Sequence, residues 1–124
     1  MSERNGRVVS IVDDDASLRR SLRNLLLSVG FRVETFASAE EFLASFHRQN
    51  TGCLVLDLRM PGTGGLELLR HLTATSPDIP VVILTAHGDA EARRQSLGAG
   101  AVAFLQKPFH CDGLLDAVRA AYRA

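Results

Sequence analysis

Short apolar runs alternate with longer segments of helical periodicity along the whole 124-residue chain. Most of these runs have Val, Ile or Leu at consecutive positions, as in strands covered on both faces. The five runs span residues 7–12, 32–36, 53–58, 81–86 and 101–106. Because a helical segment follows each run, the pattern predicts a single α/β domain over residues 1–124. We expect a (βα)5 architecture, with a doubly wound five-stranded parallel sheet and helices on both faces.

The helical segments carry apolar residues three or four positions apart, which places them on one face of each helix. Ser38 and Glu41 form a capping-box pattern, and Gly30 is a stop signal. The side chains expected to face the core are Leu18, Leu22, Leu25, Val29, Phe42, Leu43, Phe46, Leu66, Leu69, Leu72, Leu114, Val118 and Tyr122. Segment 88–98 differs, because alanines and Leu97 are its only apolar anchors. We expect it to be the least firmly packed helix and a candidate moving part.

Composition argues against several classes of protein. The chain has 14 basic and 14 acidic side chains, so this domain lacks the basic excess typical of direct nucleic acid binding. Cys53 and Cys111 fit no metal-binding spacing and are too few for a disulfide framework, so we expect free thiols. No apolar run approaches the roughly 18 residues of a membrane span, and the start has no apolar core of a signal peptide. We therefore expect a cytoplasmic protein that does not contact membranes.

Polar side chains lie at the carboxyl ends of four of the five predicted strands. They are Asp13, Asp14 and Asp15 at the first strand, Asp57 at the third, Thr85 at the fourth and Lys107 at the fifth. Taken singly, Asp15 is explained by helix capping, Thr85 by strand preference and Lys107 by surface exposure. In doubly wound folds, however, the carboxyl ends of the strands share one edge, and ligands bind there. Together these residues predict a binding site.

The acidic residues at this edge require a counter-charge. Carboxylates about 5 Å apart repel by roughly 3 kcal/mol per pair at an effective dielectric of about 20. A hard divalent cation offsets that repulsion, and few carboxylates with retained waters favour Mg²⁺ over a closed calcium site. There is no zinc motif, and the histidines are scattered singly at His47, His71, His87 and His110. The sequence therefore predicts Mg²⁺ as the cofactor.

A carboxylate beside Mg²⁺ can attack phosphorus and form an acyl phosphate. Asp57 is the candidate nucleophile. The Lys107 ammonium and the Thr85 hydroxyl would complete an electrostatic cradle for the phosphoryl oxygens. Small residues nearby, Ala86 and the glycines of PGTGG, would leave room for the phosphoryl group and for a mobile loop.

Four motifs, IVDDD, LDLRMPG, LTAHGD and FLQKPF, occur in the order and spacing of a response regulator receiver domain. From Val8 to Tyr122 the chain resembles this family of two-component signal transduction, which belongs to the CheY-like superfamily and has the flavodoxin-like fold. DLRMPGTGGLELL, TAHGD and GAVAFLQKPF are most similar to the FixJ-like subfamily. Its members commonly carry a LuxR-type helix-turn-helix output domain. The chain is thus expected to be a stand-alone regulator or the N-terminal part of a longer one with a DNA-binding output domain.

The resemblance implies that Asp57 is the phosphoacceptor and that a sensor histidine kinase is the donor. Asp14, Asp57 and the backbone carbonyl of Arg59 would ligate Mg²⁺, for which Mn²⁺ can substitute. Asp13 would act through water. Asp15 stands where many relatives have another acidic residue, and helix capping explains it as well as metal binding does. Such a protein catalyses only its own phosphorylation and dephosphorylation, so we expect a signalling protein and not an enzyme.

The resemblance also assigns roles around the phosphoryl group. Thr85 and Lys107 would contact it, and the bond from Lys107 to the following proline is a candidate cis peptide. Phe104 would be the switch aromatic, with plain core packing as the alternative. Arg59 and His87 would modulate the lifetime of the acyl phosphate, with a solvated surface role as the alternative.

Phosphorylation adds about two negative charges. We expect Thr85 to move toward them, Phe104 to turn into the vacated space and helix 88–98 to shift. The resemblance implies a partner or homodimer face made by helix 88–98, strand 101–106 and helix 112–123, with transcription as the expected output.

Three other interpretations compete with this one. Phosphatases of the haloacid dehalogenase type also use a nucleophilic Asp with Mg²⁺, but they need a second Asp where this chain has Arg59. A nucleotide- or flavin-binding domain is disfavoured because the first turn, VDDDAS, is acidic where a glycine-rich phosphate cradle is needed. A receiver-like interaction module that is never phosphorylated is the more serious rival.

Overall fold

The computed structural model describes residues 7–60, 62–86 and 89–123 and contains a five-stranded parallel sheet. The strands are β1 (Val8–Val12), β2 (Val33–Phe36), β3 (Thr51–Leu56), β4 (Val81–Thr85) and β5 (Ala103–Gln106). Their order in the sheet is β2-β1-β3-β4-β5. This order reverses direction at β1 and so confirms the predicted doubly wound α/β fold.

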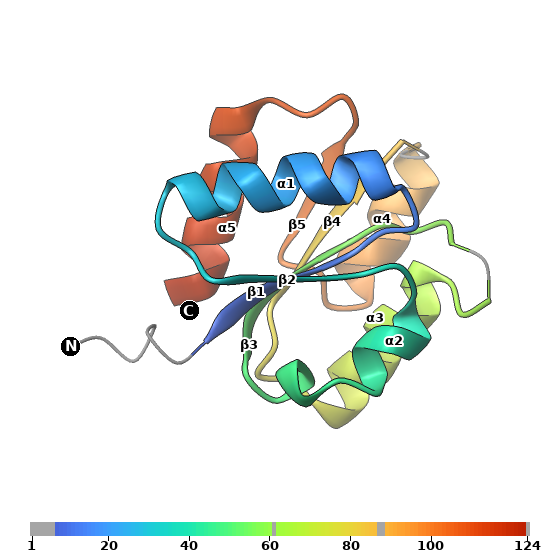
Figure 1. The fold of residues 1–124 in the computed structure, drawn as a ribbon. Coiled ribbons are helices and arrows are strands. Elements are labelled where there is room, and N and C mark those ends of the chain that lie inside the picture. Colours follow the sequence, from blue (N-terminus) through green and yellow to red (C-terminus); the bar gives the residue numbers. More distant parts are fainter. Residues whose placement is uncertain (1–6, 61, 87–88, 124) are drawn as a thin grey trace.

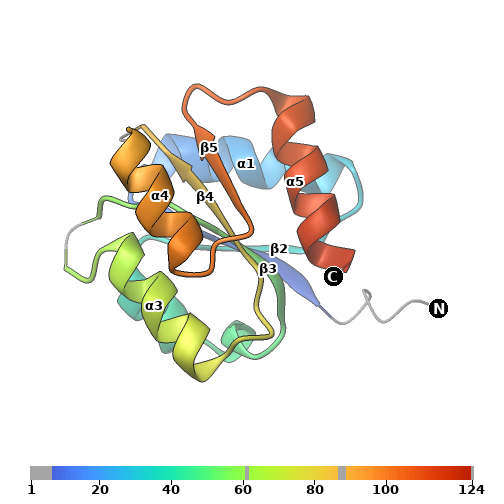
Figure 2. The same cartoon turned by 180° about the vertical axis from the view of Figure 1, so that it is seen from behind.

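Helices cover both faces of the sheet. They are α1 (Ala16–Ser28), α2 (Ala39–Leu43), the 3₁₀ helix η2 (Phe46–Arg48), α3 (Gly65–Thr75), α4 (Ala90–Gly98) and α5 (Cys111–Arg123). Figures 1 and 2 show α1 and α5 on one face and α2, α3 and α4 on the other. No helix in the described part of the chain is long and apolar enough to cross a membrane.

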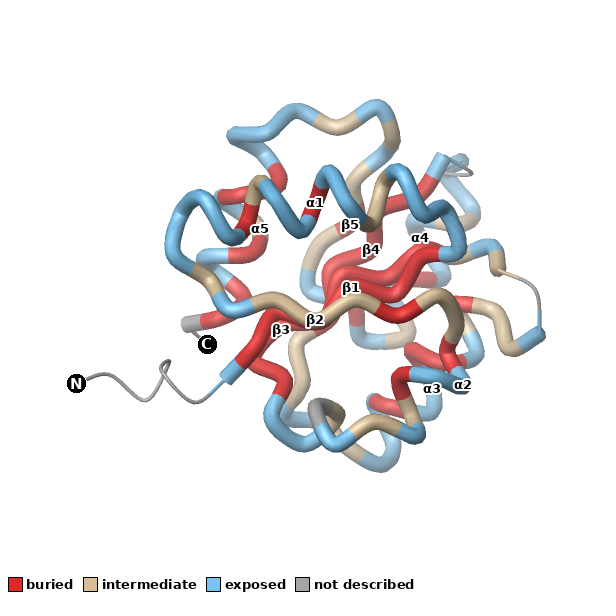
Figure 3. The backbone as a smooth tube through the Cα atoms, in the orientation of Figure 1, coloured by how far each residue is buried: buried red, intermediate tan, exposed pale blue. Residues whose placement is uncertain are grey.

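The two faces of the sheet carry separate hydrophobic clusters. One includes Val9, Val55 and Leu114, and the other includes Leu56, Phe42 and Leu69. Figure 3 shows the central strands buried, while the outer faces of the helices are exposed. The apolar strand runs thus supply both cores at once, which leaves the strand ends for polar chemistry.

Strand β3 begins and ends two residues earlier than the predicted range 53–58. Its first two residues, Thr51 and Gly52, do not fit the apolar pattern, yet both are buried. The Thr51 hydroxyl lies 2.8 Å from the Ser10 hydroxyl, and the position of a Cβ on Gly52 is filled by the Tyr122 ring. Asp57 is therefore the first residue beyond the strand. The predicted ranges 7–12 and 101–106 begin slightly earlier than β1 and β5.

The predicted core face is confirmed for α5, in which Leu114, Val118 and Tyr122 are buried. It is wrong for Phe46, whose side chain is 98% exposed, and Val29 is also exposed. Helix α2 ends at Leu43, so the helical period that would have carried Phe46 inward is not continued. The 3₁₀ geometry of η2 then turns the side chain to solvent.

Because Phe46 contributes almost no buried area, Phe46→Ala is expected to change the free energy of unfolding by no more than about 0.5 kcal/mol. Urea denaturation followed by circular dichroism measures this change. Phe42, which is fully buried, provides the comparison. Phe42→Leu is expected to cost about 1 kcal/mol although it removes fewer atoms. A larger loss at Phe46 than at Phe42 would contradict the burial assigned to both.

Helix α4 is weakly packed, as its composition predicts. Its one buried residue is Ser96, and the Ser96 hydroxyl has no hydrogen-bond partner within the described part of the chain. Leu97, the predicted anchor, is 39% exposed, so that detail of the prediction is wrong. Small side chains such as Ala92 make the remaining contacts with the core. Movement of this helix stays a prediction.

Candidate functional site

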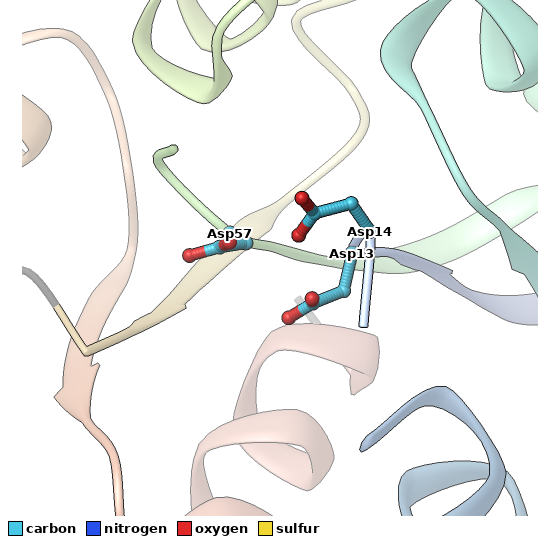
Figure 4. A group of neighbouring side chains, drawn as sticks. All are labelled: Asp13, Asp14 and Asp57. Atoms are coloured by element: carbon cyan, nitrogen blue, oxygen red, sulfur yellow. The ribbon is translucent and has the colours of Figure 1, made fainter. Parts of the chain in front are cut away.

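The acidic residues meet because β1 and β3 are neighbours in the sheet. Val12 pairs with Leu56, and the Asp57 amide donates a 3.0 Å hydrogen bond to the Val12 carbonyl oxygen. The residues that follow the two strands, Asp13 and Asp57, are therefore side by side. One carboxylate oxygen from each of Asp13, Asp14 and Asp57 lies within 4.8 Å of the others. Figure 4 shows Asp13 and Asp14 directed toward the side on which Asp57 lies.

The Asp57 carboxylate is held in an unfavourable environment. The residue is 5% exposed, and Oδ1 has no hydrogen-bond partner among the described residues. Burial raises the pKa of Asp57 above its ordinary value, and the Asp13 carboxylate raises that pKa further. The Lys107 charge, a hydrogen bond from the Thr85 side chain and one from the Leu58 backbone oppose the shift without cancelling it. An additional positive group at Oδ1 would relieve the cost of the charge.

Asp13 has both carboxylate oxygens engaged by the protein. Oδ1 accepts a 2.9 Å hydrogen bond from the Asp15 amide, and Oδ2 accepts one of 2.9 Å from Lys107 Nζ. This occupancy is compatible with the expectation that Asp13 reaches a metal through water and not directly. Asp14 is exposed, which leaves its oxygens accessible.

Lys107 is the only lysine in the sequence, in which all the other basic side chains are arginines. Its ammonium lies 2.9 Å from Asp13 Oδ2 and 4.0 Å from Asp57 Oδ1. The bond from Lys107 to Pro108 is cis, as predicted. A compact ammonium can lie near both carboxylates at once, whereas a planar guanidinium binds in a fixed fork.

Lys107→Met is expected to destabilise the fold by about 2 kcal/mol at neutral pH without divalent cations. The substitution leaves Asp13 and Asp57 buried without their nearest positive charge, and partial exposure of Lys107 moderates the cost. Urea denaturation in EDTA measures the loss, and added Mg²⁺ should reduce it. Arg94→Met is the control: the Arg94–Glu91 pair is exposed, so its removal should cost less than about 0.5 kcal/mol. Equal losses for the two variants would contradict this account.

Thr85 and Phe104 lie on adjacent strands near the site. Thr85 is fully buried at the end of β4. Phe104 pairs in register with Ile83 and is buried in the cluster beside α3 and α4. This position satisfies the core-packing alternative for Phe104. A switching role needs a second conformation and stays a prediction.

The remaining predicted residues are distributed differently. The Asp15 side chain caps α1 by accepting hydrogen bonds from the Ser17 and Leu18 amides, and Asp15 does not belong to the carboxylate cluster. Arg59 is exposed, so its proposed carbonyl and modulating roles stay predictions. His87 lies outside the described residues.

Cys53 is buried and free, and burial raises its pKa to about 12, which makes the thiol unreactive.

Gly65 is one of the glycines of PGTGG that were expected to leave room for the phosphoryl group and for a mobile loop, but it lies in a helix and packs against the backbone of the site. It is the first residue of α3, and its amide donates a 2.8 Å hydrogen bond to the Leu58 carbonyl. A Cβ here would overlap the Asp57 carbonyl oxygen and lie 2.7 Å from Leu58 Cα. The glycine thus allows α3 to press against the backbone that carries Asp57. The expected loop role is therefore wrong for Gly65, because the close contact with the Asp57 backbone is what requires a glycine here.

The donor set fits Mg²⁺. It consists of carboxylate oxygens only, and one buried oxygen, Asp57 Oδ1, has no hydrogen-bond partner in the described part of the chain. The set also leaves open positions that waters can fill. A zinc site would require nitrogen or sulfur ligands, and the cluster contains none.

Comparison with known proteins identifies relatives over most of the chain. Residues 9–119 match the family described as response regulator receiver domain. Nodulation protein W of Bradyrhizobium diazoefficiens is 47% identical, over 92% of this chain and 50% of its own length. Transcriptional regulatory protein FixJ of the same organism is 42% identical, over 93% of this chain and 56% of its own length. The solved structure of response regulator StyR has a TM-score of 0.86 and 50% identity, and covers 95% of this chain and 60% of that one.

These matches confirm the expected resemblance to the FixJ-like subfamily. They also show how much of each relative this chain corresponds to. The chain spans about half the length of the curated relatives that it matches. Residues 9–119, which match the family, contain the three carboxylates described above and the sheet apart from Val8.

Proposed function

Because this chain belongs to the response regulator receiver domain family, we propose that Asp57 accepts a phosphoryl group from a sensor histidine kinase and that the chain is thereby a two-component signalling switch. One observation supports this assignment above the others. Asp57 is buried beside Asp13 and Asp14, and its Oδ1 has no hydrogen-bond partner among the described residues but lies 4.0 Å from the ammonium of the only lysine of the sequence. A buried carboxylate with a raised pKa, close to other carboxylates and a lysine, is typical of functional sites.

Asp14, Asp57 and the Arg59 carbonyl would hold Mg²⁺, or Mn²⁺ in its place, with Asp13 contributing through water. When bound, the cation neutralises charge on the carboxylates and on the incoming phosphoryl oxygens. The closeness of Asp13, Asp14 and Asp57 supports this ligand set.

An Asp57 carboxylate oxygen forms the new bond to phosphorus while the bond from phosphorus to the kinase imidazole nitrogen breaks, and its electron pair stays on that nitrogen. Lys107, whose ammonium already lies near Asp57, stabilises negative charge on one phosphoryl oxygen. The Thr85 hydroxyl donates a hydrogen bond to another. The same groups then assist attack of water on phosphorus, which breaks the bond from phosphorus to the Asp57 oxygen, releases inorganic phosphate and returns the free carboxylate.

The new charge is proposed to draw Thr85 inward and to change the packing of Phe104 and α4. The weak packing of α4 supports this step, because few buried contacts oppose its movement. The face made by α4, β5 and α5 would then bind a second copy or an output domain. Since FixJ is a transcriptional regulator by name, transcription is the proposed output, and the cytoplasm is the proposed location.

Incubation with acetyl phosphate and Mg²⁺, followed by intact-mass measurement, tests the proposal. We expect a single added phosphate that hydroxylamine removes and that does not form in EDTA. Absence of the label would favour the unphosphorylated interaction module. Continuous turnover of many phosphate esters would favour a phosphatase.

A further inference from the structure

Arg19 links helix α1 to the acidic turn at the end of β1. It lies in the first turns of α1, and Nη1 donates a 2.7 Å hydrogen bond to the backbone carbonyl oxygen of Asp13. That carbonyl belongs to the peptide group joining Asp13 to Asp14. The guanidinium therefore restrains the plane of the peptide from which the Asp14 side chain departs.

This restraint matters because Asp14 has little else to orient it. Its side chain is exposed, and within the described residues no hydrogen bond or ion pair holds its carboxylate. Asp13, by contrast, is held at both carboxylate oxygens. In Figure 4 the Asp14 carboxylate nevertheless lies on the same side as those of Asp13 and Asp57. The backbone of the turn must supply that direction.

Electrostatic repulsion would open an unrestrained turn. The three carboxylates are close enough to repel strongly without a cation. The turn is held from the other side by the Asp15 amide and by the helix cap that Asp15 forms. The hydrogen bond from Arg19 adds a restraint at the backbone oxygen of Asp13, which these contacts do not reach.

We propose that Arg19 is a positioning residue for the divalent-cation site, holding the Asp13–Asp14 peptide so that both carboxylates face Asp57. This role rests on the proposed function, but it concerns metal affinity and can be measured without a phosphodonor. Residues that orient metal ligands from behind commonly change metal affinity by about ten- to a hundredfold when removed.

A charge effect and a positioning effect predict opposite results. Removing a positive charge near the cluster would by itself strengthen cation binding. Loss of the restraint on Asp14 would weaken it. Arg23, on the same helix, is a matched control because it is exposed and makes no contact of this kind within the described chain.

The experiment is calorimetric titration of the wild type, Arg19→Met, Arg19→Lys and Arg23→Met with MgCl₂ and no phosphodonor. We expect Arg19→Met to weaken Mg²⁺ binding about tenfold. Arg19→Lys, which keeps the charge and a donor, should recover part of the loss, and Arg23→Met should lose nothing. With acetyl phosphate, half-maximal labelling of Arg19→Met should need more Mg²⁺, while the maximal rate at saturating Mg²⁺ stays close to that of the wild type.

Urea denaturation of each variant confirms that only folded protein is compared. If Arg19→Met does not fold, Mg²⁺ binding by Arg19→Lys is compared with that of the wild type instead. Mg²⁺ binding by Arg19→Met as tight as that of the wild type would overturn the inference, as would equal weakening by Arg23→Met. A wild type that binds Mg²⁺ but takes no phosphate would refute the proposed function alone.

Discussion

Asp57→Asn is expected to abolish labelling by acetyl phosphate completely. The amide cannot form an acyl phosphate, and Asp13, the other buried carboxylate of the cluster, is engaged by Lys107 and the Asp15 amide. Intact-mass measurement in Mg²⁺ at several acetyl phosphate concentrations checks this. Undiminished labelling of the variant would refute the assignment of Asp57 as phosphoacceptor.

The same substitution should make the fold more stable at neutral pH in EDTA, by about 1 to 2 kcal/mol, because it removes a buried charge next to another carboxylate. Since the pKa of Asp57 is raised above its ordinary value of 3.8, the folded chain binds a proton more tightly than the unfolded chain does. The contribution of Asp57 to the free energy of unfolding therefore falls as pH rises from 3.8 through the raised pKa. The greater stability of Asp57→Asn relative to the wild type should therefore disappear at acidic pH.

Urea denaturation of wild type and variant in EDTA at pH values on both sides of the raised pKa measures this difference. Added Mg²⁺ should stabilise the wild type more than the variant, since the variant lacks one carboxylate ligand. A variant less stable than the wild type at neutral pH would contradict the environment described for Asp57.

Gly65→Ala is expected to destabilise the fold by about 3 kcal/mol and to slow phosphorylation. The added methyl group would overlap the Asp57 carbonyl oxygen, and backbone atoms cannot move aside as a flexible side chain can. Either α3 or the segment carrying Asp57 must shift, and each shift disturbs the site. Urea denaturation and the initial rate of labelling by acetyl phosphate measure the two effects.

Gly113→Ala is the matched control for Gly65→Ala. Gly113 also lies inside a helix, and a Cβ there meets nothing within 4 Å. Because alanine favours the helix, this variant should gain about 0.5 to 1 kcal/mol. If both substitutions stabilised the protein, the close approach of Gly65 to the Asp57 backbone would be wrong.

Much of the site can be predicted from the sequence alone. Asp57 and Thr85 are expected at the carboxyl ends of strands and Lys107 just after one, and parallel strands bring such ends to one edge. The acidic cluster follows from the same rule, and the structure brings three of its carboxylates together. Asp15 is ambiguous in the sequence because a single acidic residue before a helix suits a cap and a metal equally well. Only the hydrogen bonds from the amides of Ser17 and Leu18 decide in favour of the cap.

The sequence by itself determined the alternation of strands and helices, the parallel sheet and the edge where chemistry occurs, because these follow from periodicity and from the order of elements. Only the tertiary structure decided which side chains restrain the site. The Arg19 side chain reaches the Asp13 carbonyl across the turn between β1 and α1, and Gly65 is required because α3 packs against the Asp57 backbone. The tertiary structure also places Phe46 in solvent, because α2 ends at Leu43 and so does not carry Phe46 toward the core. Such facts depend on distances between segments, and those distances are set by packing and not by local pattern.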